Sequence, residues 1–170
     1  MFKYEIKYGI LTGAGISLWI FTEFLLGFHT VKMNLGEHSI YFVVIIPLIT
    51  TYLGIKEKRE KQNKGTISLS GGIKTGLMIS LIAAVITALF IIVYFNYINP
   101  GFFDHGIAYH KEKLLLKGKT EKEIAGQLKD IKAAFSFVNQ LLFGIIGTVG
   151  TGLIISIVLS FILKRNKPSV

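Results

Sequence analysis

Four long apolar stretches occupy about half of this chain of 170 residues, and they constrain its fold more than any other feature. They cover residues 8–28, 40–55, 77–98 and 141–163. Each approaches the roughly 20 apolar residues that cross a hydrocarbon core about 30 Å thick, and none contains a run of charges. The sequence therefore predicts an all-α four-helix transmembrane bundle, formed by a single integral membrane domain over residues 1–170.

The overall composition agrees with this class. Hydrophobic residues make up 51% of the chain, and a soluble fold would have to hide the four stretches in one small core. The net charge of +9 comes from basic residues that lie mainly between and beside the stretches. There we expect them to meet anionic lipid headgroups, and we expect no nucleic-acid partner. The absence of cysteine excludes disulfides, thiolate metal sites and a cysteine nucleophile.

The second stretch is the shortest and contains Pro47, which lacks a backbone donor. Proline inside a helix removes the hydrogen bond to the carbonyl four residues earlier, so we expect a kink near Val43. Lys56 can extend its aliphatic chain toward the interface and make up part of the missing length. The sequence thus predicts a kinked second span.

The distribution of Lys and Arg predicts the orientation. With the N-terminus inside, eleven basic residues fall on the cytoplasmic side and eight on the other side. The cluster at residues 56–61 directly adjoins an apolar stretch, whereas the lysines of the long third loop are dispersed among acids. We therefore expect a multi-pass inner-membrane protein with both termini in the cytoplasm.

The third loop, between the last two stretches, contains a helical pattern. Thr120 and Glu123 have the spacing of a capping box, and apolar residues then recur on one helical face, namely Ile124, Leu128, Ile131 and Phe135. This predicts an amphipathic helix in the outer loop. Two placements fit it: the helix lies on the headgroups, or it runs into the fourth span.

Small residues recur every three or four positions along three of the stretches, a pattern that lets helix backbones approach closely. The candidate packing residues are Gly9, Gly13, Gly72, Gly76, Ser80, Ala84, Gly144, Gly147, Gly152 and Ser156. Packing within one bundle explains such ridges, and so does association into a homo-oligomer or with other membrane proteins. The sequence leaves both uses open.

Glu23 is the only ionisable residue well inside a predicted span. A charge at this depth is costly, which points to a function such as proton or cation coupling. Two structural explanations stand beside this one. The side chain could reach the interface near Phe28, or it could pair inside the bundle with Asn96 or Asn139.

The predicted outer side holds further polar side chains. All four histidines fall there, namely His29, His38, His105 and His110, with Asp104 and Glu112 nearby. Their spacing matches no metal-ligand motif, so we expect no metal and no cofactor. A polar trio, Asn96, Asn99 and Gln140, either lines a shallow outward cavity or caps helix ends.

Short segments at the ends of the stretches carry a resemblance to a known family. They are residues 8–13, 54–60 and 72–77, followed by Ile98-Asn99-Pro100 at the end of the third stretch. In this order and spacing the chain resembles the uncharacterised bacterial membrane family catalogued as domain of unknown function 4199. The resemblance implies a four-helix inner-membrane protein whose third loop lies outside, and it implies no activity. The chain departs from it at Ser136-Phe137, where a serine-proline step would be expected.

No pattern of catalytic residues occurs in the sequence. A serine-histidine-acid order, a phosphate-binding glycine loop and paired intramembrane aspartates are all absent, so we predict no catalytic residues. We expect a non-enzymatic accessory, scaffold or regulatory subunit that acts through helix–helix and lipid contacts. The alternative is a small oligomeric transporter or ion-coupled permease that uses Glu23.

Overall fold

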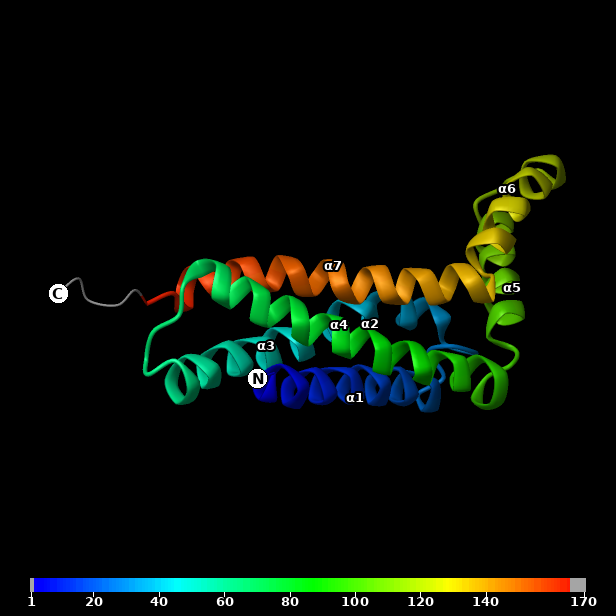
Figure 1. The fold of residues 1–170 in the computed structure, drawn as a ribbon. Coiled ribbons are helices and arrows are strands. Elements are labelled where there is room, and N and C mark those ends of the chain that lie inside the picture. The colour runs from blue at the N-terminus through cyan, green and yellow to red at the C-terminus, as the bar shows by residue number, and fades with distance from the viewer. Residues whose placement is uncertain (1, 166–170) are drawn as a thin grey trace.

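The computed structural model describes residues 2–165, with the side chain of Ile40 excepted. Nine helical elements follow one another in these residues (Figure 1): α1 (Lys3–Leu25), α2 (Met33–Val43), α3 (Ile45–Glu57), the π-helix η1 (Lys58–Gln62), α4 (Leu69–Val93), the π-helix η2 (Tyr94–Ile98), α5 (Phe102–Leu116), α6 (Glu121–Ala134) and α7 (Phe137–Leu163). The all-α fold expected from the sequence is confirmed.

Four of the helical segments are long and apolar enough to cross a membrane: Lys3–Leu25, Met33–Gln62, Leu69–Ile98 and Phe137–Leu163. They run side by side in Figure 1, so the chain is a multi-pass membrane protein with a four-helix bundle. Every span begins before its predicted start, the second by seven residues and the third by eight. Apolar stretches mark only the part of a helix that faces lipid tails, whereas backbone hydrogen bonding continues through polar residues at the interface.

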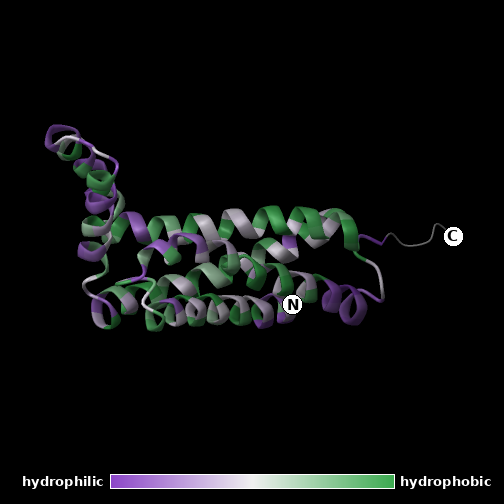
Figure 2. Ribbon diagram, turned by 180° about the vertical axis from the view of Figure 1, so that it is seen from behind, coloured by the Kyte–Doolittle hydropathy of each residue, from purple (hydrophilic) through white to green (hydrophobic). Residues whose placement is uncertain are grey.

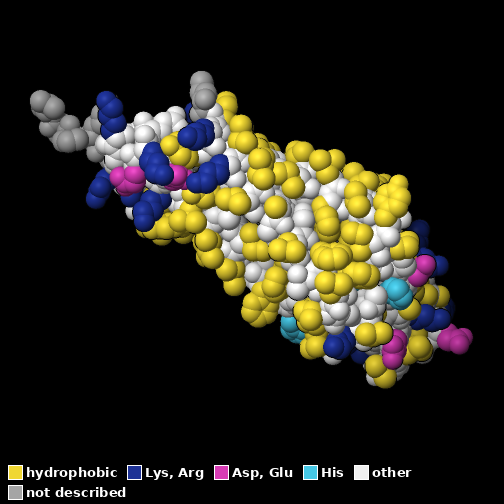
Figure 3. Space-filling view, turned by 90° about the horizontal axis from the view of Figure 1, so that it is seen from below, with side chains coloured by type: hydrophobic (Ala, Val, Ile, Leu, Met, Phe, Trp, Pro, Cys, Tyr) yellow, Lys and Arg dark blue, Asp and Glu magenta, His cyan; other side chains and the backbone are white. Residues whose placement is uncertain are grey.

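The bundle is organised around α4, which packs along both α1 and α7, while α3 also contacts α1 and α7. The start of α1, η1 and the end of α7 share one end, which we call the basic end. The α5–α6 hairpin projects from the opposite end, which we call the hairpin end (Figure 1). Hydrophilic residues concentrate at these two ends in Figure 2, and apolar side chains cover the middle of the surface seen in Figure 3.

The second span is broken, as Pro47 predicts. The α-helix is interrupted at Val44, and the Leu48 amide donates to the Val44 carbonyl at 3.2 Å, while Pro47 has no N–H to offer Val43. The helical segment is longer than the apolar stretch, since α2, α3 and η1 together extend over 30 residues. The break has a consequence for packing: α2 contacts α1 and α3 and diverges from α7.

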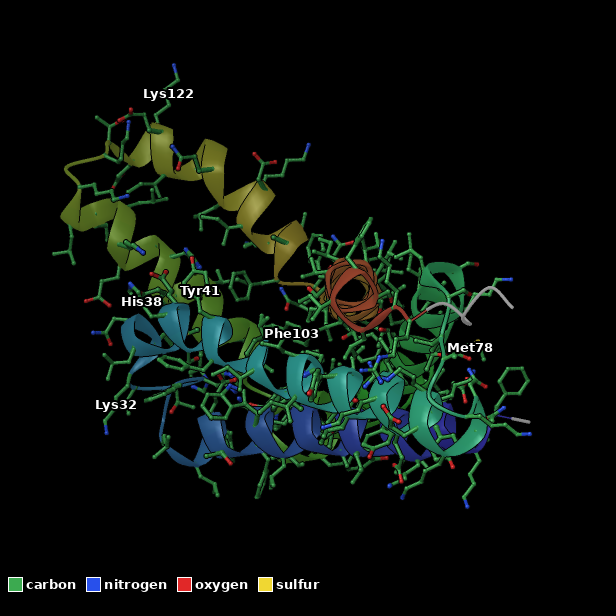
Figure 4. The ribbon with its side chains drawn as sticks, turned by 90° about the vertical axis from the view of Figure 1, so that its left-hand side faces the viewer. Lys32, His38, Tyr41, Met78, Phe103 and Lys122 are labelled. Carbon is green, nitrogen blue, oxygen red and sulfur yellow. The ribbon has the colours of Figure 1, made fainter. Side chains whose placement is uncertain are left out.

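The third loop folds into two helices, not one. Thr120 and Glu123 form the predicted capping box at the start of α6, and Ile124 is only 3% exposed. The apolar face of α6 packs on α5, where the rings of His110 and Phe135 lie 5.2 Å apart. The helix does not run into the fourth span. It lies in a hairpin beyond the bundle, with Lys122 far from the spans (Figure 4), and its placement on the headgroups stays a prediction.

The junction with the fourth span explains why α6 does not run on as α7. Ser136 accepts a hydrogen bond from the Asn139 amide and caps a new helix that starts at Phe137. Phe137 occupies the first helical position, where proline is common and where the family resemblance led us to expect it. The cap at Ser136 starts the helix although no proline is present.

Candidate functional site

A cavity of about 420 Å³ lies between the spans in the half of the bundle next to the hairpin end. Each span contributes to its wall, with Ile16 from α1, Pro47 from α3, Thr87 from α4 and Thr148 from α7. The divergence of α2 from α7 accounts for the space. In the other half, α3 and α7 close on each other through a buried apolar cluster that includes Ile55, Ile155 and Leu159.

Glu23 is the acidic residue of the cavity wall and is only 7% exposed. Trp19 Nε1 donates to its Oε1 at 2.7 Å, and the hydroxyl of Ser39 donates to the same oxygen. Its second oxygen, Oε2, lies 3.4 Å from His29 Nε2. Helix α1, the loop after it and α2 thus converge on one carboxylate.

A hydrogen-bonded chain leads from this carboxylate toward the end of α4. His29 Nδ1 lies 2.6 Å from the Tyr94 hydroxyl, which also receives a bond of 3.0 Å from Asn99 Nδ2. Tyr94 is 1% exposed, and its ring packs against Phe24, Phe95 and Phe102. The aromatic packing fixes the hydroxyl in place, and the hydroxyl in turn orients the imidazole.

Glu23 bonds to Trp19 and Ser39 inside the bundle, and neither predicted asparagine is its partner. That its side chain reaches the interface stays a prediction. Asn96 donates to the Ile92 carbonyl, and Asn139 donates to the Ala133 carbonyl. Both asparagines follow the common tendency of such side chains to bond to nearby backbone, which sequence spacing alone did not reveal.

The polar trio is divided by the structure. Gln140 lines the cavity, which is one of the two roles that the sequence predicted for the trio. Asn99 is buried and belongs to the Tyr94 chain, whereas Asn96 is exposed.

The small-residue ridges meet one another within the single chain. A Cβ added at Gly9 would lie 2.6 Å from Ile82, and one added at Gly13 would lie 2.7 Å from Ile86, so α1 and α4 touch through their backbones. Along α4 and α7 the small residues oppose each other in pairs: Gly72 faces Ser160, Gly76 faces Ser156, and Ser80 faces Gly152. Ala84, 4% exposed, continues the buried face of α4.

The remaining two glycines lie beside the cavity. A Cβ at Gly144 would lie 2.9 Å from the end of the Ile91 side chain, and one at Gly147 would have no heavy atom within 4 Å. The ridge on α7 is therefore filled by α4 near the basic end and left open near the hairpin end.

The basic end is held by ion pairs. Glu5, 1% exposed, pairs with Lys58, and Lys7 pairs with Glu57 at 2.7 Å. Arg59 donates to the Leu163 carbonyl at 3.0 Å and so gives a hydrogen-bond partner to a carbonyl in the last turn of α7. The basic cluster read from the sequence is therefore helical, and it joins three of the spans.

The four histidines do not converge. Within residues 2–165, no three His, Cys, Asp or Glu side chains are close enough to hold a metal ion. His29 belongs to the Glu23 site, and His38 bonds to the Asn34 carbonyl. His110 lies between α5 and α6, where burial lowers its pKa. The hydrogen bond from Lys113 to Glu37 raises the pKa of Lys113 and joins α5 to α2.

Sequence reasoning missed most of the groups around Glu23. A signal existed for Trp19, the only tryptophan, because it lies four residues before Glu23 on the same helical face. Ser39 and Tyr94 come from other spans, and no spacing along the chain relates them to Glu23. Their convergence depends on how the helices pack.

One family model matches residues 7–165 of this sequence, and its description is Protein of unknown function (DUF4199). No curated protein and no solved structure matches the chain significantly.

Proposed function

The chain belongs to this family of proteins of unknown function (DUF4199), and we propose that it is a non-enzymatic membrane protein that binds an amphiphilic molecule between its spans. The observation that supports the proposal is the cavity beside Glu23. Its volume of about 420 Å³ falls in the range of small-molecule sites. Such sites have mainly apolar walls and a few convergent polar groups, which is the arrangement of this cavity.

The direction of the cavity suits a lipid-like molecule. Its wall on α7 extends from Gln140 to Thr151, which corresponds to about 16 Å of helix. The two charged residues of the wall, Glu23 and His29, lie at the hairpin end. The deeper part has no charged residue and is lined by apolar residues such as Ile16 and Pro47 together with three threonines, Thr87, Thr148 and Thr151. An amphiphile with its headgroup near the hairpin end and its chain along α7 satisfies both parts.

Trp19 offers a direct test, because it is the only tryptophan and lines the cavity. We would titrate the protein in dodecyl maltoside micelles with 6-bromododecan-1-ol, whose bromine lies midway along the chain at the depth of Trp19 and quenches tryptophan fluorescence on contact. Binding in the cavity predicts quenching that saturates at a low mole fraction of the probe.

A matched pair of variants separates the cavity from the general surface. Gly147→Phe fills the cavity and should weaken the saturable quenching by at least about tenfold, whereas Gly150→Phe should not. Neither glycine has a heavy atom within 4 Å of its added Cβ, and only Gly147 lines the cavity. Quenching that rises linearly with probe, or that responds equally to both variants, would refute the proposal.

For the orientation we propose an inner-membrane location with the basic end in the cytoplasm. Eleven of the 19 basic residues of the sequence belong to that side, and they are suited to anionic headgroups. Single cysteines at Lys61 and Lys122 on the cysteine-free background test this. A membrane-impermeant maleimide added to intact cells should label Lys122→Cys and spare Lys61→Cys, and the reverse pattern would overturn the orientation.

Within one chain, α1, α4 and α7 cover most of the small-residue ridges. Partners of this protein would therefore have to bind to other surfaces. We propose that the protein acts as an accessory or regulatory subunit through its apolar outer surface. Cross-linking from Val158→Cys on the exposed side of α7 and from Gly76→Cys in the packed ridge tests this. The proposal requires cross-links from the first position only.

A second candidate is an ion-coupled permease that uses Glu23, and one specific observation favours it. The chain of bonds from Glu23 through His29 and Tyr94 to Asn99 joins a buried carboxylate to the end of α4. Proteoliposomes with a pH-sensitive dye inside would report proton flux. The permease requires that Glu23→Gln abolish a measurable flux while leaving the folded yield unchanged, and the absence of flux in the natural protein would exclude proton coupling.

A further inference from the structure

The charge of the cavity is set by two side chains. Of the residues that line it, only Glu23 and His29 can carry a charge near neutral pH, since the described wall contains no lysine or arginine. A carboxylate in such an environment requires a compensating positive charge, because an unpaired buried charge is strongly unfavourable. The state of His29 therefore decides whether the protein itself supplies this charge.

The hydrogen bonds favour a neutral His29. In the described part of the chain, the Tyr94 hydroxyl has two partners, His29 Nδ1 and Asn99 Nδ2. The amide nitrogen can only donate, so the hydroxyl hydrogen has one acceptor available, which is an unprotonated Nδ1. The proton of the neutral imidazole then lies on Nε2 and faces Glu23 Oε2.

The two oxygens of Glu23 are unequally satisfied. Oε1 accepts a hydrogen bond from the Trp19 N–H, which can act only as a donor. It also lies within hydrogen-bond distance of the Ser39 hydroxyl, whose single hydrogen is shared between Oε1 and the Gly36 carbonyl. Oε2 has only the 3.4 Å contact with His29. With His29 neutral, no side chain of the described wall compensates a negative charge on Glu23, and Oε2 is free to receive a further partner.

Several aromatic residues line the cavity together with Glu23. Trp19, Tyr94, Phe95, Phe102 and Phe143 all belong to its wall. Aromatic faces attract cations, and rings around a carboxylate are a recurrent way of binding ammonium groups. An anionic headgroup at this position would meet a like charge and no basic side chain.

We propose that the cavity selects an amphiphile with a cationic ammonium headgroup, held between Glu23 Oε2 and the aromatic rings, with its alkyl chain along α7. This inference rests on the proposed function and specifies its ligand class. The headgroup supplies the positive charge that the described cavity wall lacks.

Three brominated probes with the same chain length test the charge preference. They are 6-bromododecyltrimethylammonium, 6-bromododecan-1-ol and 6-bromododecanoate, each followed by quenching of Trp19 in the same micelles. We expect half-maximal quenching by the ammonium probe at a mole fraction about tenfold lower than for the alcohol, and the weakest quenching by the carboxylate.

Glu23→Gln and Glu23→Asp are the matched variants. Glu23→Gln keeps an acceptor oxygen for Trp19 and should remove the preference for ammonium while leaving the alcohol unaffected. Glu23→Asp keeps the charge and should retain part of the preference. If either variant fails to fold, the ranking of the three probes on the natural protein decides.

The outcomes separate the two proposals. Equal quenching by the three probes, or a preference that survives in Glu23→Gln, would overturn the cationic headgroup and leave binding in the cavity intact. The absence of saturable quenching by any of the probes would overturn the proposed function and this inference together.

Discussion

The two halves of the bundle are built from the same four spans and pack in opposite ways. Near the basic end, glycine and serine on α4 and α7 oppose each other, and α3 closes against α7. Near the hairpin end, α2, which ends at the break at Val44, diverges from α7. A cavity with a buried carboxylate takes the place of a packed core there. Close backbone approach gives stability in one half, whereas the open half provides space for a ligand.

The largest effect that tests this comparison is expected at Gly76. Gly76→Leu would force a branched side chain into the Ser156 contact between α4 and α7, where the backbones leave no room. We expect a loss of more than about 3 kcal/mol of stability and little folded protein. Gly150→Leu on α7 is the control, since nothing lies within 4 Å of its Cβ. Fluorescence-detected size-exclusion chromatography after heating measures both variants, and equal losses would contradict tight packing at Gly76.

The next effect concerns the two ion pairs of the basic end. Lys58→Ala leaves Glu5 buried without its partner, and we expect it to destabilise the protein by about 2–3 kcal/mol. Lys7→Ala removes one partner of Glu57. Because the Lys7 side chain is 48% exposed, this loss should be much smaller than that of Lys58→Ala.

Thermal unfolding in nanodiscs compares these two lysine variants, and the double variant Glu5→Gln/Lys58→Met should recover most of the loss. If Lys7→Ala were the more harmful single change, burial would not be what makes the Glu5 pair important.

A smaller effect, of opposite sign, is expected at Gly147 in the open half. Gly147→Leu adds a side chain to the cavity and a better helix former to α7, so we expect unchanged stability or a gain of about 0.5–1 kcal/mol. The same thermal unfolding measurement applies. A loss similar to that of Gly76→Leu would mean that the hairpin half is closed in the membrane, and the contrast between the halves would disappear.

The smallest effect lies outside the bundle, in the hairpin. Thr120→Ala removes one side of the capping box and should destabilise the start of α6 by about 1 kcal/mol, without changing global unfolding. Amide exchange at residues 121–124 would show this local change. Faster exchange in the spans as well would indicate that the hairpin supports the bundle.

The capping box of α6 also predicts how the stability of this helix depends on pH. The hydrogen bond from Lys119 is the main cause that lowers the pKa of Glu123 to about 2, with help from Thr120. Because this pKa lies below its value in an unfolded chain, the bonds of Glu123 contribute stability at neutral pH, and this contribution is lost as the pH falls from about 4 to about 2. Carboxyl carbon NMR should give this low midpoint, and Lys119→Met should move it upward.

The sequence by itself determined the class of this protein and much of its local structure. Runs of apolar residues have no stable alternative to a bilayer, so the spans and the all-α fold followed directly. Pro47 and the Thr120–Glu123 box act through hydrogen bonds between residues close in sequence, and the kink and the cap therefore appear where the sequence placed them. The spacing of small residues showed which helix faces pack closely, without showing what covers them.

Only the tertiary structure decided which groups surround Glu23 and where the bundle stays open. Ser39, His29 and Tyr94 lie 16, 6 and 71 positions from Glu23 in the chain. Ser39 and His29 contact Glu23, and Tyr94 contacts His29, because α2 and α4 pack beside α1. The cavity lies where α2 diverges from α7, and the pattern of neither segment shows how the two helices lie relative to each other. Spacing along a helix fixes neighbours one or two turns away, whereas contacts between helices depend on packing that no local pattern encodes.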